Sequence, residues 1–476
     1  MTTYDADDGN PAEQKKSKLL EQMRRVGESS GRNRTERLNR QPQAQPRHVT
    51  RFEDLPEYKR VATQRMAGEL LGVANPFYRS HDAAAGATTR IGGREFVNFA
   101  SYDYLATNTD PHVATRAKEA IDRFGISASA SRLVAGERPG HVELERRLAS
   151  VYGVDAAVCF VSGYLTNVAA IGCLMGPQDL VIHDEFIHNS ALAGIKLSGA
   201  ARRLFQHNDV DSLENILKTL SSDFRRVLVI VEGIYSMDGD IADLPALLEL
   251  KTRYGFWLMV DEAHALGILG KTGRGTFEHF DLDPRDVDIW MGTLSKTTSS
   301  CGGYIAGSSA LADILKAEAG GFVYSVGLSP VLAAAAIAGL DILKSEPKRT
   351  ERLRRNGHLF LEEAKAAGLD TGLSMGHSVV PVIVGDSLRA AQLSNDLLAE
   401  GINVLPIIHP AVPEGMARLR FFITCDHTEE QIRRAVRLTA EKLKSLKDRN
   451  FGLASLDMEK MMQLLPLAQA PAPGGS

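Results

Sequence analysis

Short apolar segments recur along the chain, separated by stretches in which apolar residues return at helical spacing. The segments expected to be strands cover residues 156–161, 180–183, 227–231, 257–260, 289–294 and 304–306. Strands that alternate with helices favour a mainly parallel sheet covered by helices on both faces, which is an α/β fold. Ligands of such sheets bind beyond the carboxyl ends of the strands. Residues at those ends are therefore the first candidates for chemistry.

Changes in composition divide the chain into five predicted regions. Residues 1–50 contain few large apolar side chains, so we expect a disordered extension there. Residues 51–97 are predicted to form an N-terminal segment of helix and strand, and residues 98–345 a large domain. A smaller α+β domain is expected at 346–450. Residues 451–476 end in Ala, Pro, Gly and Ser and are predicted to form a flexible tail.

Local signals support the smaller C-terminal domain. The charged stretch from Lys344 to Lys348 contains Pro347 and interrupts the apolar pattern. After it, strands are expected at 379–384 and 418–424. The last helix is predicted to begin with the capping box Thr-Glu-Glu-Gln at 428–431, in which the first and last side chains bond each other's backbone.

Composition and charge exclude several classes of protein. The chain has 476 residues, of which 44% are hydrophobic and 24% charged, enough for two domains with substantial cores. A net charge of -4 gives no basic surface, so we expect no nucleic-acid partner. The four cysteines lack CxxC spacing and are expected to be free thiols. With no signal pattern and no apolar run near the roughly 20 residues that span a bilayer, a cytoplasmic protein is expected.

Three side chains at predicted strand ends suggest a particular chemistry. Lys296 follows the segment 289–294, while Asp261 and His264 follow 257–260. A lysine with a lowered pKa forms a Schiff base with a carbonyl such as the aldehyde of pyridoxal phosphate (PLP). An aspartate can keep the pyridine nitrogen of PLP protonated, and His264 is placed to reach the ring's phenolic oxygen. Singly, Lys296 fits a solvated lysine and Asp261 a helix cap, but together they favour PLP.

Seven motifs in a familiar order strengthen this interpretation. They are NFASYDYL at 98–105, SRLVAG at 131–136, FVSGY at 160–164, EGIYSMDGD at 232–240, DEAH at 261–264, TLSK at 293–296 and ARLR at 417–420. From about residue 75 to about 446, the chain resembles the α-oxoamine synthases, a branch of the fold-type I PLP-dependent transferases. The resemblance implies a large domain with a mainly parallel sheet of the seven-stranded type. It also implies PLP as cofactor and a homodimer with active sites at the subunit interface.

The resemblance assigns the phosphate of the cofactor to the start of a predicted helix. Gly163 and Tyr164 open an apolar helical stretch, and backbone N–H groups at a helix N-terminus bind anions. These N–H groups and the Thr293 hydroxyl are implied to hold the phosphate. Relatives often add a Thr from the neighbouring subunit, but this chain has Val326 there. That leaves Ser325 as the hydroxyl for this contact.

Catalytic roles follow from the same resemblance. His188 matches the position whose imidazole stacks on the pyridine ring and assists the reaction, and Ser236 matches a position near the phenolic oxygen. Lys296 is implied to be the Schiff-base lysine and to act in removal of the Cα proton. The implied reaction is a decarboxylative, Claisen-type condensation of serine, alanine or glycine with an acyl thioester, carried on CoA or an acyl carrier protein, to give an α-amino ketone.

Substrate contacts are expected at two places. The family binds the amino-acid carboxylate with an arginine that matches Arg420, although Arg418 lies on the same face of the predicted strand and the sequence does not separate them. Tyr102, where many members carry Asn, resembles the serine palmitoyltransferase-like and polyketide-associated members. The segment 407–413 lacks the arginine that pimeloyl-accepting members tend to carry, so an acid-terminated acyl chain is less expected.

Parts of the sequence pattern are compatible with other functions. The nearer alternative is another fold-type I enzyme, such as an aminotransferase or an aldolase, which would not release both CO₂ and free thiol. A P-loop ATPase is suggested by a relaxed Walker A pattern at 265–272 and a Walker B-like segment at 257–262, but a single strand would then have to serve both elements. The histidines and carboxylates do not follow His-Glu-x-x-His spacing, so we expect no metal.

Overall fold

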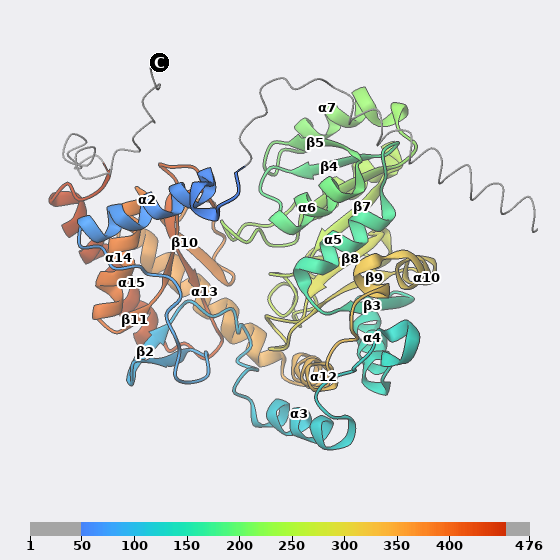
Figure 1. Cartoon of the computed structure of the whole chain (residues 1–476), viewed down its shortest axis with the longest axis horizontal. Coiled ribbons are helices and arrows are strands. Elements are labelled where there is room, and N and C mark those ends of the chain that lie inside the picture. Colours follow the sequence, from blue (N-terminus) through green and yellow to red (C-terminus); the bar gives the residue numbers. More distant parts are fainter. Residues whose placement is uncertain (1–48, 454–476) are drawn as a thin grey trace, which may run out of the picture. The chain divides into compact units, whose positions relative to one another are not determined.

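A seven-stranded sheet is the largest sheet of the protein (Figure 1). The computed structural model describes residues 49–453, and the strand order is β3-β9-β8-β7-β6-β4-β5. Neighbouring strands are parallel except around β9, which runs antiparallel to both β3 and β8. The strands are β3 (Ala156–Phe160), β4 (Leu180–Asp184), β5 (Ala201–Phe205), β6 (Val227–Glu232), β7 (Trp257–Asp261), β8 (Ile289–Thr293) and β9 (Gly303–Gly307). The predicted mainly parallel sheet is confirmed.

Alternation along each strand divides the apolar side chains between two cores. In β6, Val227, Val229 and Val231 belong to one buried cluster, whereas Leu228 and Ile230 belong to another. Successive side chains of a strand point to opposite faces, so the two clusters are the two faces of the sheet. Both faces are buried, which explains why the central strands are almost continuously apolar.

Helices cover both of these faces. The smaller cluster includes side chains from α5 (Gly163–Leu174), α6 (Asn189–Ser198), α10 (Ser309–Glu318) and α11 (Gly320–Val323). The larger cluster includes side chains from α4 (Pro139–Tyr152), α7 (Val210–Leu220), α8 (Leu244–Tyr254), α9 (Thr276–His279) and α12 (Pro330–Ser345). Helix α3 (Pro111–Phe124) buries Val113 against Ala335, Ala338 and Ile342 of α12. The result is the predicted arrangement of helices on both sides of one sheet.

A smaller α+β region follows α12. Its antiparallel sheet has the order β10-β13-β12, and its strand β11 joins β1 and β2, which come from before α3, in a second small sheet of order β1-β2-β11. The strands are β1 (Thr88–Ile91), β2 (Arg94–Asn98), β10 (Val379–Gly385), β11 (Ile402–Asn403), β12 (Leu405–Ile407) and β13 (Ala417–Phe422). The helices are α13 (Pro347–Ala366), α14 (Ser387–Ala399) and α15 (Glu429–Asp448). Helix α15 begins with the predicted capping box, formed by Thr428 and Gln431.

Strands β5 and β11 could not be anticipated from the apolar pattern. Strand β5 contains the exposed residues Arg202 and Arg203, because it lies at the edge of the sheet and has only one neighbour, β4. Strand β11 has two residues and pairs in parallel with β2, about three hundred positions earlier in the chain. The six predicted strands of the large sheet are all present, with no end displaced by more than one residue.

The chain forms two compact units, one up to Met66 and the other from Ala67 onward. The described part of the first unit holds a 3-10 turn, Phe52–Asp54, and most of helix α2 (Pro56–Leu70). The domain boundaries expected at 97, 345 and 450 stay predictions. The expected disordered extension at 1–50 and flexible tail at 451–476 lie almost entirely outside the described residues. Within residues 49–453, no helix is both long and apolar enough to cross a membrane, and the cytoplasmic location stays a prediction.

Candidate active site

A cavity of about 180 Å³ lies at the carboxyl ends of the parallel strands. Asp261 ends β7, Thr293 ends β8 and Glu232 ends β6, and all three line the cavity. The remaining lining residues are Tyr102, Ser162, Gly163, Tyr164, Asn167, His188, Ser190, Ser236, Ala263, His264, Met291, Ser295 and Lys296. Parallel strands bring their carboxyl ends to one edge of a sheet, which is why residues distant in sequence meet here.

Lys296 occupies the turn that follows β8 and is half-buried. Its Nζ atom lies 5.8 Å from the centre of the Tyr102 ring. Desolvation by the surrounding protein lowers the pKa of Lys296 to about 8, and the charge of Arg420 adds to this effect, while Asp261 and Glu232 oppose it. A lysine with such a pKa is partly neutral near physiological pH and can act as a nucleophile or a base.

Asp261 is held in place by two hydrogen bonds. Oδ1 accepts from the N–H of Ala263 at 2.9 Å, and Oδ2 accepts from Nδ2 of Asn167 at 3.0 Å. The same Nδ2 donates to Oγ of Ser190 at 2.9 Å. Asn167 was missed in the sequence, although the signal was present: it is a lone amide in the apolar stretch that forms α5. A buried amide in an apolar helix requires partners, and here they are site residues.

His188 caps helix α6 and reaches the same network. Its Nδ1 atom accepts from the N–H of Ser190 and lies 2.7 Å from Oγ of that serine. A ring nitrogen that accepts a backbone N–H carries no proton, so the neutral ring has its proton on Nε2. The pKa of His188 is lowered, chiefly because protein atoms desolvate the ring and also because of the charges on Lys296 and Arg420. His188 is thus joined to Asp261 through Ser190 and Asn167.

His264 lines the cavity and is fixed from behind. Its Nδ1 atom is 2.7 Å from the hydroxyl of Tyr104, and its ring stacks on Phe422 at 6.3 Å between centres. Burial lowers the pKa of His264 well below its ordinary value, so the ring is neutral. The bond to Tyr104 was not anticipated, and it leaves only Nε2 for a ligand. The contact of His264 with a phenolic oxygen stays a prediction.

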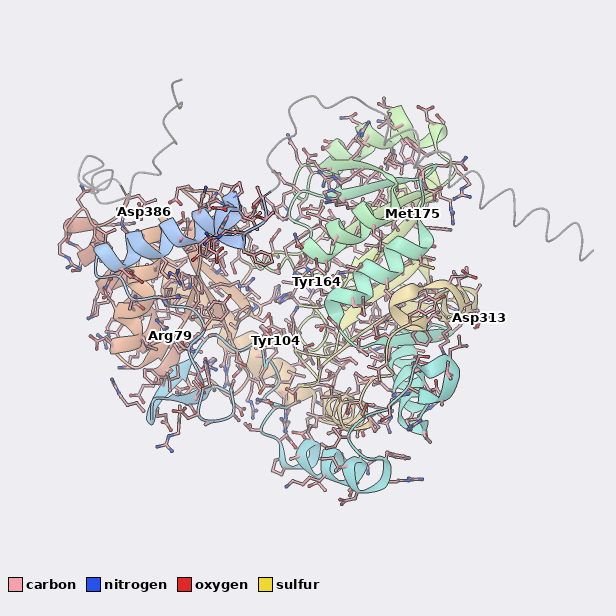
Figure 2. All side chains as sticks on the ribbon, viewed as in Figure 1. Arg79, Tyr104, Tyr164, Met175, Asp313 and Asp386 are labelled. Carbon is pink, nitrogen blue, oxygen red and sulfur yellow. The ribbon has the colours of Figure 1, made fainter. Side chains whose placement is uncertain are left out.

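The start of helix α5 forms a small cradle with the end of β8. Ser162 caps the helix, and Tyr164 lies in its first turn (Figure 2). The first N–H groups, of Gly163 and Tyr164, have no preceding turn of helix to bond. A Cβ atom at position 163 would lie 2.9 Å from Oγ1 of Thr293, so only glycine allows this close approach. Unpaired N–H groups at a helix N-terminus, together with a hydroxyl, suit an anion.

The two arginines that the sequence could not separate are separated by the structure. Arg418 is buried and pairs with Asp238 at 2.7 Å, which is a structural role. Arg420 donates from Nη1 to the carbonyl of Ser236 at 2.9 Å, while its buried Nε has no hydrogen-bond partner among the described residues. Ser236 lines the cavity, so this bond places the guanidinium next to the lining although Arg420 is not part of it. The charge of Arg420 also lowers the pKa of Lys296.

Glu232 shows that the cavity is built for a polar ligand. The carboxyl accepts from the N–H of Ser236 at 3.0 Å through Oε2, but buried Oε1 has no partner within the described part of the chain. Burial and the nearby charge of Asp261 raise the pKa of Glu232 to about 8. Oδ1 of Asn167 is likewise buried without a partner. Buried polar atoms without a partner in the protein call for an explanation, and at a cavity a polar ligand provides one.

One predicted site residue is not brought to this cavity. Ser325 lies in the turn after α11, between the exposed side chains of Tyr324 and Val326, and does not line the cavity. The expectation was a contact with the site of a neighbouring subunit, which a single chain does not display. The contact of Ser325 with phosphate stays a prediction.

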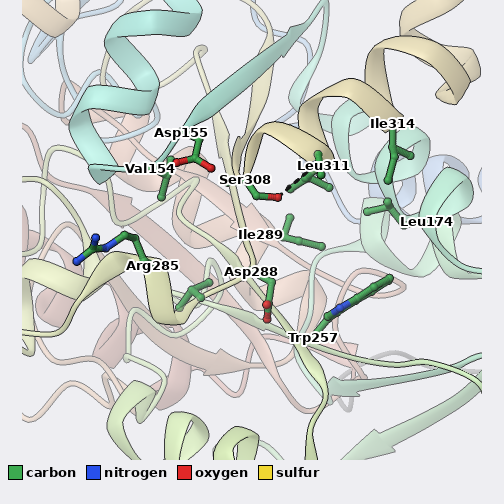
Figure 3. A pocket seen from close by; sticks show the side chains of 13 residues that line it. Val154, Asp155, Leu174, Trp257, Arg285, Asp288, Ile289, Ser308, Leu311 and Ile314 are labelled. Atoms are coloured by element: carbon green, nitrogen blue, oxygen red, sulfur yellow. Dashed lines mark hydrogen bonds between the residues drawn. The ribbon is translucent and has the colours of Figure 1, made fainter.

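A second cavity, of about 390 Å³, lies at the opposite ends of the strands (Figure 3). Its polar side chains are already used within the protein. Asp288 accepts from Lys251 at 2.9 Å, Asp155 accepts from the N–H of Ser309, and Arg285 pairs with Asp283. The Ser308 hydroxyl caps α10. These pairings leave the named side chains of this lining engaged within the protein.

The Walker-like segment does not have the geometry of a phosphate loop. Residues 265–275 form a series of turns directly after β7, and the next helix, α9, begins only at Thr276. Lys271 is exposed and precedes the first residue of α9 by five positions. A phosphate loop instead passes directly from a strand into a helix that carries its lysine. The structure therefore gives the ATPase hypothesis no support.

Comparison with known proteins identifies the family. The model of the family "Aminotransferase class I and II" matches residues 94–438. The 8-amino-7-oxononanoate synthase of Symbiobacterium thermophilum is 41% identical over 346 residues, which cover 73% of this chain and 88% of the relative. The 8-amino-7-oxononanoate synthase 1 of Bacillus subtilis is 36% identical over 368 residues, covering 77% and 92%.

Solved structures agree with these relatives. The serine palmitoyltransferase of Sphingomonas wittichii superposes with a TM-score of 0.79 at 29% identity, over 83% of this chain and 99% of that one. A structure described as SPT with a PLP internal aldimine gives the same TM-score at 28% identity, over 83% and 99%. The fold is therefore that of the fold-type I PLP-dependent transferases, and PLP is the cofactor. The chain belongs to the class I and II aminotransferase family and, within it, to the α-oxoamine synthases, which are acyltransferases.

Proposed function

We propose that this α-oxoamine synthase condenses serine, alanine or glycine with an acyl thioester, on CoA or an acyl carrier protein, releasing CO₂ and the thiol and leaving an α-amino ketone. The observation that carries the proposal is the convergence of an amine, a carboxylate and an arginine at one cavity. Lys296 and Asp261 line it, and Arg420 lies close enough for its charge to act on Lys296. The names of the relatives fit: 8-amino-7-oxononanoate carries an amine next to a ketone, and serine palmitoyltransferase joins an acyl group to serine.

The residues present fit the cofactor. The anion cradle at α5, the carboxyl at the end of β7 and the unpaired buried atoms of Glu232 and Asn167 together suit a molecule with a phosphate and a polar ring. When bound, PLP supplies an electron-poor ring that takes up the electron pair left at the substrate's Cα. The residues that we propose to hold it are Gly163, Tyr164, His188, Ser236, Asp261, His264, Thr293 and Lys296, with Ser325 supplied by a partner subunit.

Lys296 and His188 are the proposed catalytic residues. An amine with a pKa of about 8 is present in both protonation states near neutral pH, so Lys296 can accept a proton from Cα and return it later. His188 is neutral and is fixed through its Nδ1 atom by Ser190, which leaves Nε2–H as its hydrogen-bond donor. The proton on Nε2 can stabilise the oxygen of an attacked thioester carbonyl.

The amino-acid end of the substrate is assigned to Arg420. Its guanidinium has a buried, unpaired Nε beside the cavity, and a guanidinium binds a carboxylate through two parallel hydrogen bonds. The bond from Nη1 to Ser236 fixes its orientation. Tyr102 is proposed to contact the substrate as well, since its ring lies against Phe422 at 5.5 Å and near Lys296. Residues 407–413 carry no arginine, so a medium or long acyl chain without a terminal acid is proposed.

A homodimer is proposed from an exposed apolar surface. The apolar patch consists of Ile126, Leu133, Val134, Tyr324 and Val326, whose exposed fractions run from 48% to 88%. Its two segments are joined, because the N–H of Gly327 donates to the carbonyl of Ala130 at 3.0 Å. Ser325 lies within the patch, so a second copy that covers the patch would also bury this hydroxyl. This placement supports an active site completed across the subunit interface.

Replacing Lys296 by Ala is expected to abolish turnover, because no other amine of residues 49–453 lines the cavity. The assay offers each of the three amino acids with a series of acyl thioesters and measures the amino ketone by mass spectrometry, together with CO₂ and free thiol. Lys271→Ala, which removes the exposed lysine of the Walker-like segment, is the matched control and should retain full activity. An aminotransferase or aldolase product from the unmodified enzyme, without CO₂ and thiol, would refute the proposal.

Covalent attachment of PLP is expected to depend on pH through Lys296. The neutral amine is the attacking form, so the attachment rate of the apoenzyme should rise with pH and level off above the lysine's pKa of about 8. The rate is measured as the PLP fixed to the protein by borohydride at successive times. Lys296→Ala should fix none at any pH. A rate that falls between pH 7 and pH 9 would contradict the assignment.

The two arginines provide a matched pair of variants. Arg420→Lys is expected to raise the KM for the amino acid by about 10- to 100-fold, since losing a charged hydrogen bond costs roughly 1.5–3 kcal/mol. Arg418→Lys keeps a cation beside Asp238 but loses the planar guanidinium, so it should lower thermal stability. Because Arg418 is assigned a structural role, this KM should change by less than about threefold. Steady-state kinetics over a range of amino-acid concentrations separates the two. Equal effects on KM would remove Arg420 from the substrate site.

Subunit association is tested by placing a charge in the apolar patch. Val134→Asp is expected to convert the dimer to a monomer of about half the mass, because a buried unpaired carboxylate opposes association. Leu197→Asp is the control, since Leu197 is 67% exposed and lies outside the patch on α6. Light scattering after gel filtration gives the masses. A protein that is monomeric without any substitution, yet active, would rule out the shared site.

A further inference from the structure

Three buried charged groups lie near the cavity without lining it. The imidazole of His207 stands between two carboxylates, with Nδ1 2.8 Å from Oδ1 of Asp184 and Nε2 2.9 Å from Oδ2 of Asp240. The three side chains are 8%, 0% and 9% exposed, respectively. The proposed reaction assigns a role to none of them. Burying charged groups is costly, so such a cluster calls for a physical explanation.

His207 is an imidazolium in this setting. Both of its ring nitrogens face carboxylate oxygens, which only accept, so both nitrogens carry protons. Burial alone lowers the pKa of His207, but the hydrogen bonds and charges of Asp184 and Asp240 outweigh burial and raise the pKa to about 10. The ring of Phe186 stacks on the imidazolium at 4.3 Å, and Tyr235 meets it edge-on at 4.5 Å. The cation is therefore enclosed and persists at neutral pH.

The cluster joins three strand ends that are neighbours in the sheet. Asp184 is the last residue of β4, His207 follows β5 by two positions, and Asp240 lies in the loop after β6. The order β6-β4-β5 places these ends side by side. Asn208 adds to the link, since its N–H donates to Asp184 at 2.9 Å and its Nδ2 donates to Asp240 at 2.6 Å.

Two of the loops that are joined in this way carry residues of the active site. His188 lies four positions after Asp184 in the loop after β4. Ser236 lies in the loop after β6, where the N–H of Tyr235 donates to the carbonyl of Asp240 at 2.9 Å. Ser236 in turn accepts the hydrogen bond from Arg420. A change in the spacing of these loops would therefore move a catalytic residue and the proposed substrate arginine relative to each other.

We propose that His207 is a positioning residue whose cation, held between Asp184 and Asp240, sets the distance between the loop that carries His188 and the loop that carries Ser236. The proposal rests on the proposed function for the roles of His188 and Arg420. Without the cation, two buried carboxylates would face each other unneutralised, and the loops would separate to let in water. Small displacements of aligned groups reduce rates strongly.

The first measurement does not depend on activity. In the holoenzyme, His207→Gln is expected to speed amide hydrogen exchange in the segments 184–190 and 233–241, because glutamine cannot supply the missing charge. His279→Gln makes the same chemical change at an exposed histidine at the end of α9, outside the cavity, and should leave both segments unchanged. Asp240→Asn, which keeps the carboxyl shape and removes its charge, carries the same test if His207→Gln does not fold. Unchanged exchange in both segments would overturn the proposal.

Kinetics distinguish positioning from a purely structural role. His207→Gln is expected to reduce kcat/KM for the amino acid by about 10- to 100-fold, while bound PLP per subunit stays at the unmodified level. Bound PLP is retained because Asp261 on β7, Thr293 on β8 and Lys296 in the turn after β8 lie outside the two loops. Of the residues proposed to hold PLP, the loops carry only His188 and Ser236. A purely structural role would instead lower thermal stability and PLP content and leave kcat per bound PLP unchanged. That second pattern would refute the positioning role.

The charge state is measured separately. Nitrogen NMR of the protein with labelled histidine should show both ring nitrogens of His207 protonated at about pH 8, whereas a ring with one proton would overturn the proposal. If the unmodified enzyme yields no condensation product but His207→Gln shows faster exchange in both segments, the positioning role is supported and the proposed function is refuted. If the unmodified enzyme forms the condensation product but His207→Gln leaves exchange unchanged, the proposed function is supported and the positioning role is refuted.

Discussion

The placement of opposite charges at the buried carboxyl ends of the strands is the constraint on which the site depends. Asp261 and Glu232 attract a proton to Lys296, while desolvation and Arg420 act against it, and the result is a lysine with a pKa of about 8. Burial and the charge of Asp261 raise the pKa of Glu232 to a similar value, about 8. In water, a lysine and a glutamate have pKa values far from neutral pH. Burial and neighbouring charges move both values towards neutral pH, where these groups can exchange protons.

These charges stay in place because a frame of buried polar bonds surrounds them. Asn167 ties Asp261 to Ser190, and Ser190 fixes His188. Tyr104 fixes His264 in the same way. The proposed role of His207 extends this frame outward to the edge of the sheet. Preorganised polar groups of this kind need not rearrange when charge moves during a reaction, and that is how a rigid scaffold favours catalysis.

Much of the fold was predictable because the sequence pattern and the physical demand coincide. A strand buried on both faces must be largely apolar, so continuous apolar runs predicted β4, β6 and β7. The start of α15 was predicted from its capping box. Strand β5 was missed because its exposed arginines suit an edge, and β11 because a two-residue strand has no pattern of its own. Tyr104 was missed because a hydrogen bond between distant segments leaves no local trace. Asn167 left a signal, as a lone amide in the apolar stretch of α5, but the sequence did not show which distant groups it binds.

The sequence by itself determined the kinds of groups available, namely one lysine, one aspartate, histidines, arginines and a glycine, at the ends of segments that could only be strands. Only the tertiary structure decided which of them meet. Arg418 pairs with Asp238, whereas Arg420 lies beside the cavity with its Nε unpaired among the described residues. Strand alternation could not predict this difference, because both arginines lie on the same face of the strand. The physical reason is that identity and spacing are local properties, whereas burial, charge neighbours and hydrogen-bond partners arise when distant segments pack together.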